Sequence, residues 1–522
     1  MTLHLRSTLT RTKEPFASLV AGAVRMYTCG PTVYRYAHIG NLRSYLLADL
    51  LRRALLARGF DVLHVKNITD VGHLRDERFD RGEDKMLVAA KLEAKSPEEI
   101  ARFYEATFHA DEALVNILPA HVFPRATDHI DEMIAMVERL EDGGFAYAVE
   151  GNVYYDVSRF PGYGALSGNT LDELRAGHRG EIEADKRDPA DFALWKRTGE
   201  GRLAKWQTRR WGEGFPGWHI ECSAMATKYL GEQFDIHTGG IDNVFPHHED
   251  EIAQSQALTG VLPARYWVHG EHLLVAGRKM AKSAGNFQRI TELAEQGIEP
   301  LAFRLLCLTS HYRAKMNVSD ESLRGAQAGL ASLRARARAI GREAATSTAL
   351  GGLVAPDGGV AAGHPGPDGV VPPGMGTADP AELSAPARAL YERWTAAIDD
   401  DLDLPKGLAI VREAVKASDL PAAERRWLLL EADRVLGLDL AREIDAGAAA
   451  AASDAREQPP GTAPDAPLPA GAAALLAERA AARVGKDWPR SDALRAELAA
   501  IGVVVVDRPG GAQEWRVSDD VT

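Results

Sequence analysis

Two of the three cysteines lie in segments whose neighbouring side chains are suited to binding a metal. Cys29 ends an apolar stretch, Cys222 lies in FPGWHIECSAMA, and His247 and Glu251 follow in FPHHEDEIAQS. Thiolate, imidazole and carboxylate groups form a ligand set that zinc accepts. The separations along the chain are not those of a zinc finger. A shared metal and two separately buried cysteines therefore both remain open, and the fold decides between them.

The histidine pair belongs to a predicted helix. Pro246 suits the first turn of a helix, which then runs on through Glu251. His247 and Glu251 are four residues apart and share one helical face. His248 has Ile252 at the matching position and gains no liganding partner. In the alternative interpretation, the acidic residues only stabilise the N-terminus of the helix.

The segment from Met26 to Ser44, MYTCGPTVYRYAHIGNLRS, is typical of an anion-binding turn. The apolar run ending at Cys29 predicts a buried strand, GPT ends it, and leucines with helical spacing follow. Free N–H groups and the helix dipole favour phosphate at such a helix N-terminus. His38 and Asn41 can donate hydrogen bonds to phosphoryl oxygens there. Taken alone, HIGN is more typical of a surface histidine in an ordinary strand-to-helix loop.

The segment GRKMAKSAGN, residues 277–286, offers a second group of phosphate-binding side chains. Lys279 and Lys282 are bracketed by glycines, so that a mobile loop can carry two ammonium groups to a triphosphate. Such a clamp suits phosphoanhydride chemistry, because charge builds on the leaving pyrophosphate only as the bond breaks. By itself the segment is more typical of a solvated basic loop.

Together, HIGN and KMAKS resemble the paired signatures of class I aminoacyl-tRNA synthetases. Asn41 stands where that family often has a second histidine, and Ala281 stands where it often has serine. Asn41 keeps a hydrogen-bond donor but carries no charge. The resemblance implies catalytic and ATP-binding roles for His38, Asn41, Lys279 and Lys282.

Four segments narrow the resemblance to cysteinyl-tRNA synthetases: CGPTVY…HIGN, GWHIECSAM, DIHTGGIDNVFPHHEDEIAQS and KMAKSAGN. The similarity covers the catalytic portion nearly end to end and returns near the C-terminus. It implies one zinc ion per chain, held by Cys29, Cys222, His247 and Glu251, with the substrate thiol bound directly to the metal. Zinc prefers soft sulfur to a hydroxyl, whereas a plain pocket rejects serine only weakly. Because four protein ligands usually close a zinc site, catalysis requires a fifth ligand or the release of one, for which Glu251 is the candidate.

The same resemblance assigns the remaining site residues. The residues implied to line the cysteine pocket are Gly30, Thr69, Trp218 and His237. The residues implied to approach the adenosine are Gly239, Gly240 and Asp242, beside the four signature residues. As lone residues, Trp218 and His237 are more typical of core or boundary side chains, and GGID is more typical of a turn.

The implied activity is the ligation of L-cysteine to tRNA(Cys) with ATP, through a cysteinyl-adenylate, with Mg²⁺ accompanying the nucleotide. Two other hypotheses remain open. A related type of ligase joins cysteine to an amino-sugar and lacks the C-terminal recognition unit. A zinc-stabilised RNA-binding protein with a decayed ATP site is the non-enzymatic hypothesis, against which the intact His38, Lys279 and Lys282 argue.

A nucleotide-binding fold must position these residues. The strand before Cys29, a helix from residue 41 and a second strand in DVLHVKNITD predict half of a parallel sheet. We therefore expect an α/β fold whose Rossmann-like catalytic domain comprises residues 1–117 and 213–300. A connective insertion is expected at 118–212, with a helix at 129–142 and the strand GNVYYDV. A helical tRNA-binding region is expected at 301–445, with a disordered insertion at 344–384.

The C-terminal part contains low-complexity sequence and a compact end. Half of residues 351–380 are Gly or Pro, above the roughly 25–30% typical of disorder, and we expect no catalytic role there. An Ala/Pro-rich run predicts a linker at 446–470. Residues 471–522 predict two amphipathic helices, the strand GVVVVD, a turn and the strand AQEWRV. This pattern resembles the small anticodon-recognition unit of the same family, with a generic α+β appendage as the alternative.

Composition limits the class of protein. The 522 residues allow about three domains, and the net charge of −13 argues against a protein that coats nucleic acid indiscriminately. A local basic stripe still suffices for RNA; residues 333–342, LRARARAIGR, are a candidate, although their arginines spread around the helix. Without an apolar run of about 18 residues or a secretion signal, and with three cysteines, we expect no membrane span and a cytoplasmic location. We also expect a monomer.

Overall fold

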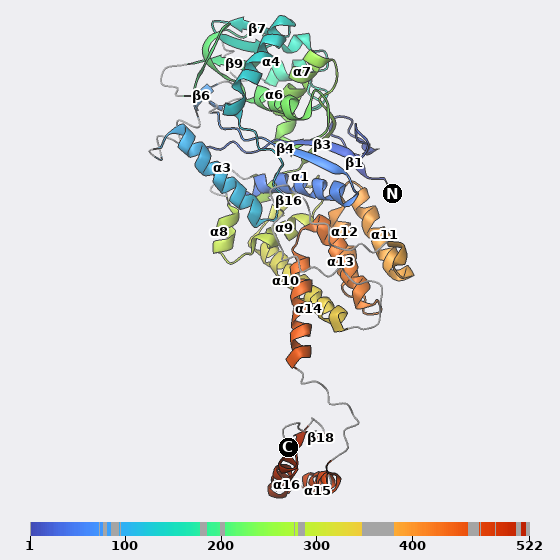
Figure 1. The fold of residues 1–522 in the computed structure, drawn as a ribbon. Helices are drawn as coiled ribbons and strands as arrows, with labels where there is room; N and C mark the ends of the chain where they lie inside the picture. Colours follow the sequence, from blue (N-terminus) through green and yellow to red (C-terminus); the bar gives the residue numbers. More distant parts are fainter. Residues whose placement is uncertain are drawn as a thin grey trace. The chain divides into compact units, whose positions relative to one another are not determined.

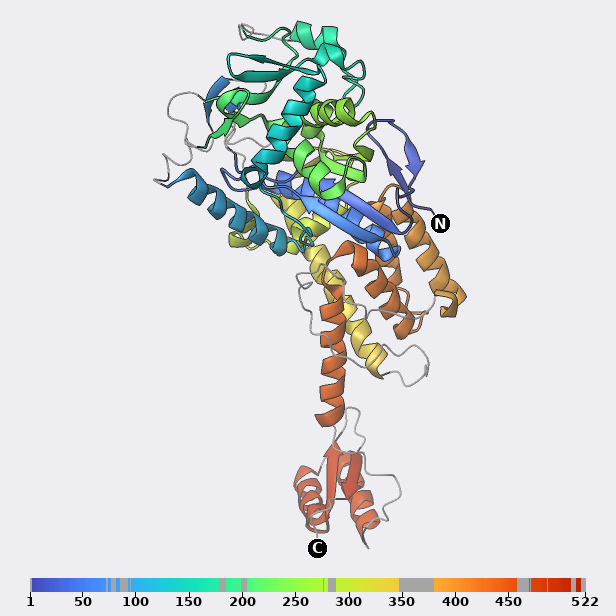
Figure 2. The same cartoon turned by 45° about the horizontal axis from the view of Figure 1, so that its top comes forward.

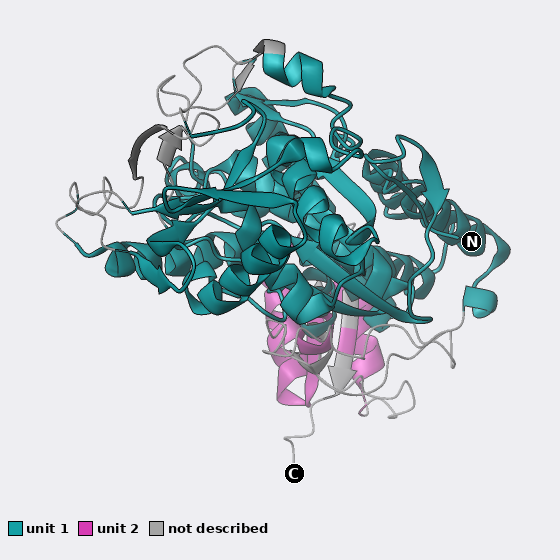
Figure 3. Ribbon diagram, turned by 90° about the horizontal axis from the view of Figure 1, so that it is seen from above, with its two compact units in different colours: residues 1–449 teal, residues 450–522 magenta. Residues whose placement is uncertain are grey.

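The computed structural model (Figure 1) describes most of the chain. The described residues are 2–71, 74–76, 81–84, 93, 95–177, 185–198, 204–275, 277–279, 288–346, 380–457, 469, 471–485, 487–507 and 513–517. Contacts divide the chain into two units, Met1–Ala449 and Ala450–Thr522, which are coloured separately in Figure 3. The predicted insertion at 344–384 falls largely outside the described residues.

A four-stranded parallel sheet lies at the centre of the first unit. Its strand order is β13-β12-β3-β4, formed by Ala264–Gly270, Phe234–Gly240, Ala23–Thr28 and Asp61–Lys66. Met26 pairs with Ile236 on one side and with His64 on the other. The carboxyl ends of parallel strands meet at one edge of a sheet, where open α/β folds bind ligands. The predicted α/β class with a parallel sheet is confirmed.

Helices cover both faces of this sheet (Figure 1). Successive residues of β3 point to opposite faces: Met26 joins the core that contains the leucines of α1 (Ile39–Ala57). Tyr27 joins a second core that contains residues of α6 (Trp218–Leu230) and α7 (Glu249–Thr259). α1 begins two residues earlier than predicted, because His38 acts as its N-cap.

The helical turn before α7 is irregular. Phe245 has an extended backbone, with φ −142° and ψ 133°, inside the turn Val244–His248. The helical backbone therefore begins anew at Pro246, in the first turn as predicted, and α7 continues from Glu249.

The chain between β4 and α6 contains an antiparallel sheet and its helices, which lie to one side of the parallel sheet (Figure 2). Its order is β10-β11-β9-β8-β7, formed by Trp206–Thr208, Gly212–Pro216, Phe192–Arg197, Asn152–Tyr155 and Ala146–Val149. The helix predicted at 129–142 is α4 (Ile130–Asp142), and α5 spans Leu171–Gly177. The boundaries of this insertion stay a prediction.

Several shorter elements also belong to the first unit. α3 (Pro97–Leu114) begins with a capping box between Ser96 and Glu99. Two ribbons are β1 (His4–Arg6) with β2 (Lys13–Pro15), and β5 (Leu74–Asp76) with β6 (Arg81–Asp84). A small sheet joins β15 (Arg278–Lys279), β14 (Leu273–Val275) and β16 (Met316–Val318).

A group of helices follows. They are α8 (Ile290–Glu295), α9 (Pro300–Leu308), α10 (Asp320–Thr346), α11 (Ala385–Asp399), α12 (Leu404–Ala414), α13 (Ala422–Leu436) and α14 (Leu440–Glu457). Arg304 of α9 is fully buried and donates to Asp49 of α1 at 2.6 Å. This ion pair connects the helical group to α1, the helix that follows β3.

Part of the predicted linker is helical. α14 runs through residue 457, although composition predicted a linker at 446–470. Alanine is the strongest helix former, and a Cβ atom at Gly447 would lie 2.0 Å from the Arg338 carbonyl oxygen of α10. The glycine therefore permits close packing of two helices. In the candidate basic stripe, Arg334 pairs with Glu299 and Arg338 pairs with Glu443, so that both arginines serve the fold.

The second unit contains the elements predicted for it. α15 (Ala472–Val484) and α16 (Trp488–Ala500) precede the antiparallel pair of β17 (Val503–Asp507) and β18 (Gln513–Val517). The predicted turn between the strands lies outside the described residues. Within the described part of both units, no helix is long and apolar enough to cross a bilayer.

Candidate functional site

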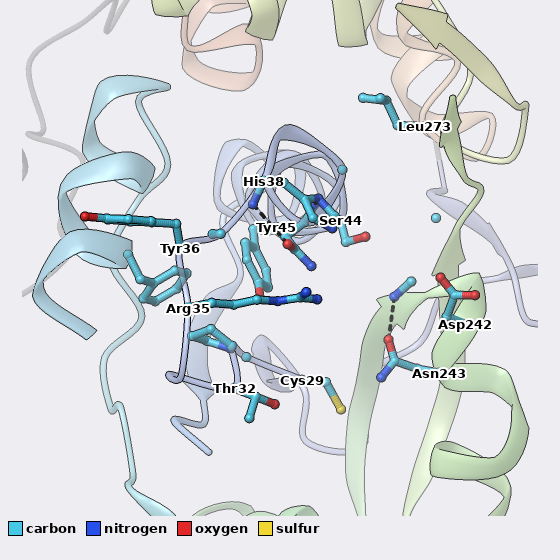
Figure 4. A pocket seen from close by; sticks show the side chains of 18 of the residues that line it. Cys29, Thr32, Arg35, Tyr36, His38, Ser44, Tyr45, Asp242, Asn243 and Leu273 are labelled. Carbon is cyan, nitrogen blue, oxygen red and sulfur yellow. Dashed lines mark hydrogen bonds between the residues drawn. The ribbon is translucent and has the colours of Figure 1, made fainter. Parts of the chain in front are cut away.

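A cavity of about 410 Å³ opens where the strands of the parallel sheet end (Figure 4). Cys29 and Gly30, which follow β3, lie at one end of it together with Trp218. His38 and Asn41 at the start of α1 line another part, opposite the turn 240–243 that follows β12. The cavity thus joins a thiol and a helix N-terminus.

The four predicted metal ligands converge at the thiol end. Cys29 comes from the exit of β3, Cys222 from α6, His247 from the helical turn Val244–His248, and Glu251 from the first turn of α7. All four side chains are buried, and their ligand atoms lie within 4.8 Å of one another. The convergence removes the alternative of two separately buried cysteines, because the fold brings the thiols to 3.9 Å.

The spacing of these atoms fits a tetrahedral zinc site. Zinc–ligand bonds of about 2.0–2.3 Å place neighbouring tetrahedral ligands roughly 3.3–3.8 Å apart. Cys29 Sγ lies 3.9 Å from Cys222 Sγ and 3.7 Å from Glu251 Oε1. His247 Nε2 lies 3.1 Å from Glu251 Oε1. The donor set therefore fits this ion in both chemistry and geometry.

Burial raises the pKa of both thiols. Cys29 has a pKa well above its usual range because of burial, followed by its contact with Cys222. Burial likewise raises the pKa of Cys222. Thiolate charge is thus unfavourable at this position without a positive partner. A divalent cation reverses this preference, because a coordinated thiol loses its proton.

Two further histidines join the cluster, one of which the helical-spacing argument had set aside. His248 Nε2 lies 3.1 Å from Cys29 Sγ, and His237 Nε2 lies 2.9 Å from Glu251 Oε2. These two histidines, with Cys29 and Glu251, form a second set of ligand atoms within 4.8 Å of one another. The statement that His248 gains no partner was wrong: it considered only residues four apart, whereas His248 and Glu251 are three apart and also share a face.

Side chains behind the cluster fix its histidines. His248 Nδ1 lies 2.7 Å from His269 Nε2, and His219 Nδ1 lies 2.9 Å from His247 Nδ1. Trp218 lies over His247 with ring centroids 4.3 Å apart. Partners of this kind hold ligand rings in one orientation.

The four residues expected to contact the amino acid fall into two pairs. Gly30 and Trp218 line the cavity. Thr69 is buried beside it and donates to Glu221 at 3.0 Å, and His237 is buried behind Glu251. At Gly30 a Cβ atom would lie 1.8 Å from the Asn67 carbonyl oxygen, so only glycine fits there.

His38 and Asn41 form a capping box at the start of α1. The Asn41 N–H donates to His38 Nδ1, and the His38 N–H donates to Asn41 Oδ1, both at 3.1 Å. Because Nδ1 accepts, a neutral His38 ring carries its proton on Nε2, which is therefore its donor atom. The helix dipole adds positive potential at the same place.

The segment GGID forms the opposite wall. Gly240 and Asp242 line the cavity, and the Gly240 N–H donates to Asn243 at 3.0 Å. At Gly239 a Cβ atom would lie 2.8 Å from His248 Cε1, so this glycine allows the turn to approach the metal cluster.

Other cavity residues carried no signal in the sequence. His272 Nδ1 lies 3.5 Å from Asp242 Oδ2, and Arg35 extends into the cavity in Figure 4. Only the structure identifies these two residues as part of the cavity, since they lie beside the motifs.

The two signature lysines are only partly visible. Lys279 belongs to β15, where its backbone pairs with Leu274. Its side chain and all of Lys282 lie outside the described residues, so their predicted contact with ATP stays a prediction.

Comparison with known families defines the class. The family model described as "tRNA synthetases class I (C) catalytic domain" matches residues 15–328, and that described as "Cysteinyl-tRNA ligase anticodon binding domain" matches 465–516. The chain thus has the catalytic domain of a class I tRNA synthetase.

Relatives narrow this class further. A cysteine–tRNA ligase of Thermus thermophilus is 41% identical over 99% of this chain and 100% of its own length. That of Treponema denticola is 38% identical over 98% and 99%, and cysteine–tRNA ligase 1 of Burkholderia lata is 42% identical over 98% and 96%. The chain therefore belongs to the cysteine–tRNA ligase family and is an enzyme of that family.

Solved structures share the fold at low identity. A Mycobacterium tuberculosis methionyl-tRNA synthetase in complex with methionyl-adenylate has a TM-score of 0.53 at 16% identity, covering 85% of this chain and 94% of its own. An Agrobacterium radiobacter K84 LeuRS in a ternary complex with tRNA and LeuAMS has a TM-score of 0.53 at 12% identity, covering 82% and 85%. These likenesses support the fold alone.

Proposed function

We propose that this protein ligates L-cysteine to tRNA(Cys) with ATP, through a cysteinyl-adenylate, and selects the amino acid through a zinc-bound thiol. The observation that carries this proposal is the convergence of Cys222, His247 and Glu251 on Cys29, which lines one end of a single cavity. The other part of that cavity contains the start of α1, where phosphate binding is favourable. A thiol-bearing amino acid and a nucleotide can therefore meet inside it.

Cys29, Cys222, His247 and Glu251 would hold one zinc ion. When bound, zinc supplies a Lewis acid that lowers the pKa of a coordinated thiol and prefers sulfur to a hydroxyl oxygen. Glu251 is the residue most suited to yield its position, because it is the hardest ligand and its other oxygen already contacts His237. Trp218 would cover a small substrate with aromatic surface.

At the nucleotide end, the chain's own groups orient and stabilise phosphate. His38 would donate from Nε2, and the first-turn amides of α1 would add their dipoles. Asn41, Lys279 and Lys282 are proposed to assist, with Mg²⁺ accompanying ATP. Gly239, Gly240 and Asp242 are proposed to receive the adenosine, with the Asp242 carboxylate accepting from ribose hydroxyls.

No side chain has to act as the nucleophile. The carboxylate of cysteine attacks the α-phosphorus of ATP and pyrophosphate leaves, after which a terminal ribose hydroxyl of the tRNA attacks the activated carbonyl and AMP leaves. Orientation and charge stabilisation therefore supply most of the rate.

The second unit is proposed to recognise the tRNA anticodon. Its match to an anticodon-binding family model supports this role. The amino-sugar ligase hypothesis provides no role for such a unit. A cytoplasmic location and a monomeric state stay predictions.

Cysteine-dependent ATP–pyrophosphate exchange, with metal analysis on the same sample, tests the proposal. We expect exchange with cysteine but not with serine, about one zinc per chain, and charging of tRNA(Cys) in preference to transfer to an amino-sugar. Transfer to the amino-sugar alone would support the second hypothesis. Absence of exchange in zinc-loaded protein would leave only the RNA-binding hypothesis.

A further inference from the structure

Two side chains from distant parts of the chain stack on one another beside His38. The guanidinium carbon of Arg289 lies 3.4 Å from the centroid of the Tyr36 ring. Tyr36 lines the cavity two residues before His38, and Figure 4 shows it at the edge of the cavity, next to α3. Arg289 directly precedes α8. The stack therefore connects the cavity wall to the segment that enters α8.

Arginine is an unfavourable residue at position 289, the N-cap of α8. Arg289 is the N-cap residue of α8, where a positive charge opposes the helix dipole and the side chain offers no acceptor for free N–H groups. Glu292 compensates in part by accepting from the Arg289 backbone N–H at 2.9 Å. A residue that breaks a local preference calls for a compensating contact elsewhere. Here that contact is the Tyr36 ring.

A backbone hydrogen bond joins the same two segments. The N–H of Ile39, the first residue of α1, donates to the Gln288 carbonyl at 3.0 Å. Ile39 directly follows His38, and Gln288 directly precedes Arg289. The start of α1 and the entry to α8 are thus linked twice, once through the backbone and once through the stack.

Helix α3 encloses the stack from a third side. Tyr104 meets the Tyr36 ring edge-on, with centroids 4.9 Å apart and an interplanar angle of 86°. Asp111 is buried, and neither of its carboxylate oxygens has a hydrogen-bond partner in the described part of the chain. Burial raises the pKa of Asp111 to about 6, and the charge of Arg289 opposes this shift. A guanidinium is therefore held between an aromatic face and the field of a buried carboxyl.

We propose that Tyr36 and Arg289 are positioning residues for adenylyl transfer, which clamp the start of α1 and the entry to α8 into one frame around His38. This inference rests on the proposed function, because it assigns the clamp to the adenylate-forming step. Neither residue needs to touch the reacting atoms. The clamp acts by holding the ring of His38 where its Nε2 meets the phosphates, which lowers the cost of orienting ATP.

Exchange kinetics of four variants test the clamp. We expect Arg289→Ala and Tyr36→Ala each to lower kcat for pyrophosphate exchange about tenfold, the scale of a partly desolvated cation–π contact, with KM for cysteine unchanged within about twofold. Tyr36→Phe keeps the ring and should retain parental kcat. Arg289→Lys should recover little, because an ammonium group does not stack as a planar guanidinium does.

The double variant Tyr36→Ala/Arg289→Ala separates a clamp from two independent effects. If the residues act as one unit, the double variant loses no more than the worse single variant. Multiplication of the two losses, or a kcat of Arg289→Ala within twofold of the parent, would overturn the proposal.

A matched control exists elsewhere in the chain. The guanidinium carbon of Arg187 lies 3.9 Å from the Tyr147 ring centroid, away from the cavity. Arg187→Ala removes a similar stack and should leave kcat at the parental value. An equal loss in this variant would show that any lost arginine–tyrosine stack lowers the rate, and would overturn the clamp.

Hydrogen exchange keeps the clamp distinguishable from the proposed function. In Arg289→Ala, the amides of residues 288–295 should exchange at least about fivefold faster than in the parent, whereas those of α13 should not change. Unchanged protection at 288–295 would overturn the clamp even in an active enzyme. If Arg289→Ala shows this change in protection but the parent protein shows no cysteine-dependent pyrophosphate exchange, the result would instead contradict the proposed function alone.

Discussion

The two ends of the cavity are built in different ways. At the thiol end, the side chains of Cys222 and Glu251 are almost fully buried, and each ligand contacts another ligand or a buried histidine. At the end formed by the start of α1 and the turn 240–243, the side chain of Asp242 is 61% exposed and that of His272 is 27% exposed. The first end is a closed donor set and the second is an open surface of amides, glycines and half-exposed polar groups.

Under the proposed function, the difference follows from what each end would bind. Distinguishing sulfur from oxygen requires a rigid arrangement in which one bond decides the outcome. A triphosphate that enters and leaves as pyrophosphate requires an accessible surface whose charges can adapt. We therefore expect substitutions at the closed end to act in an all-or-none manner, and substitutions at the open end to act in steps.

The largest effect is expected for Cys222→Ala. Loss of one ligand from the closed set should reduce zinc from about one per chain to near zero and lower cysteine-dependent exchange by at least about 10³-fold. Zinc content by metal analysis and pyrophosphate exchange measure the two outcomes. Cys307→Ala is the matched control, because Cys307 is a buried thiol of α9 in a different core and should be neutral for both. Parental zinc content in Cys222→Ala would remove Cys222 from the site.

The next largest effect is expected for His38→Ala at the open end. Removal of one donor to a developing phosphate charge should lower kcat for exchange by about 10²–10³-fold, with zinc content unchanged and KM for cysteine within about twofold. The N-cap is lost as well, at a cost of about 0.5–2 kcal/mol in stability.

His38→Asn separates capping from catalysis. Asparagine is a good N-cap, so that thermal unfolding should return close to the parental midpoint. Its amide is shorter than the imidazole, so that the loss of kcat should remain. Recovery of both properties together would mean that His38 acts only as a cap.

An intermediate effect is expected for His248→Gln, which sharpens the description of the closed end. If Cys29, Cys222, His247 and Glu251 bind zinc, His248 supports the ligands from behind. Its loss should then weaken zinc binding about 10–100-fold in a chelator competition, whereas His247→Gln should abolish stoichiometric binding. The reverse ranking would assign the metal to the second set, which contains His237 and His248.

The sequence predicted the fold better than it predicted the metal site. The fold class, the helix at 129–142 and the C-terminal α+β unit are predictable because local periodicity and turn residues determine them. The metal ligands are dispersed from residue 29 to residue 251, and spacing alone left the shared site open. Only the resemblance to a family connected them, because convergence is a property of the sheet and of no single segment.

The sequence failed where packing overrides composition. An alanine-rich run predicted a linker at 446–470, yet α14 continues into it as far as residue 457, and Gly447 lets the helix approach α10 closely. His248 was set aside because only one helical spacing was considered. Arg289 and Tyr36 gave no signal at all, since a stack between residues so far apart in the chain exists only after the start of α1 and the entry to α8 have met.

The smallest effect is expected for Asp242→Asn. Because the carboxylate is mostly exposed and water can replace its contacts, one lost hydrogen bond to ribose should raise KM for ATP only about 2–10-fold. KM for cysteine and zinc content should not change, since neither depends on the open wall. A deoxy-ATP lacking the bound ribose hydroxyl provides the internal control: it should bind the parent more weakly, and Asp242→Asn should add little to that loss. Full additivity with the deoxy substitution would mean that Asp242 does not contact the ribose. A change above about 100-fold would mean that the open end is as tightly determined as the closed one.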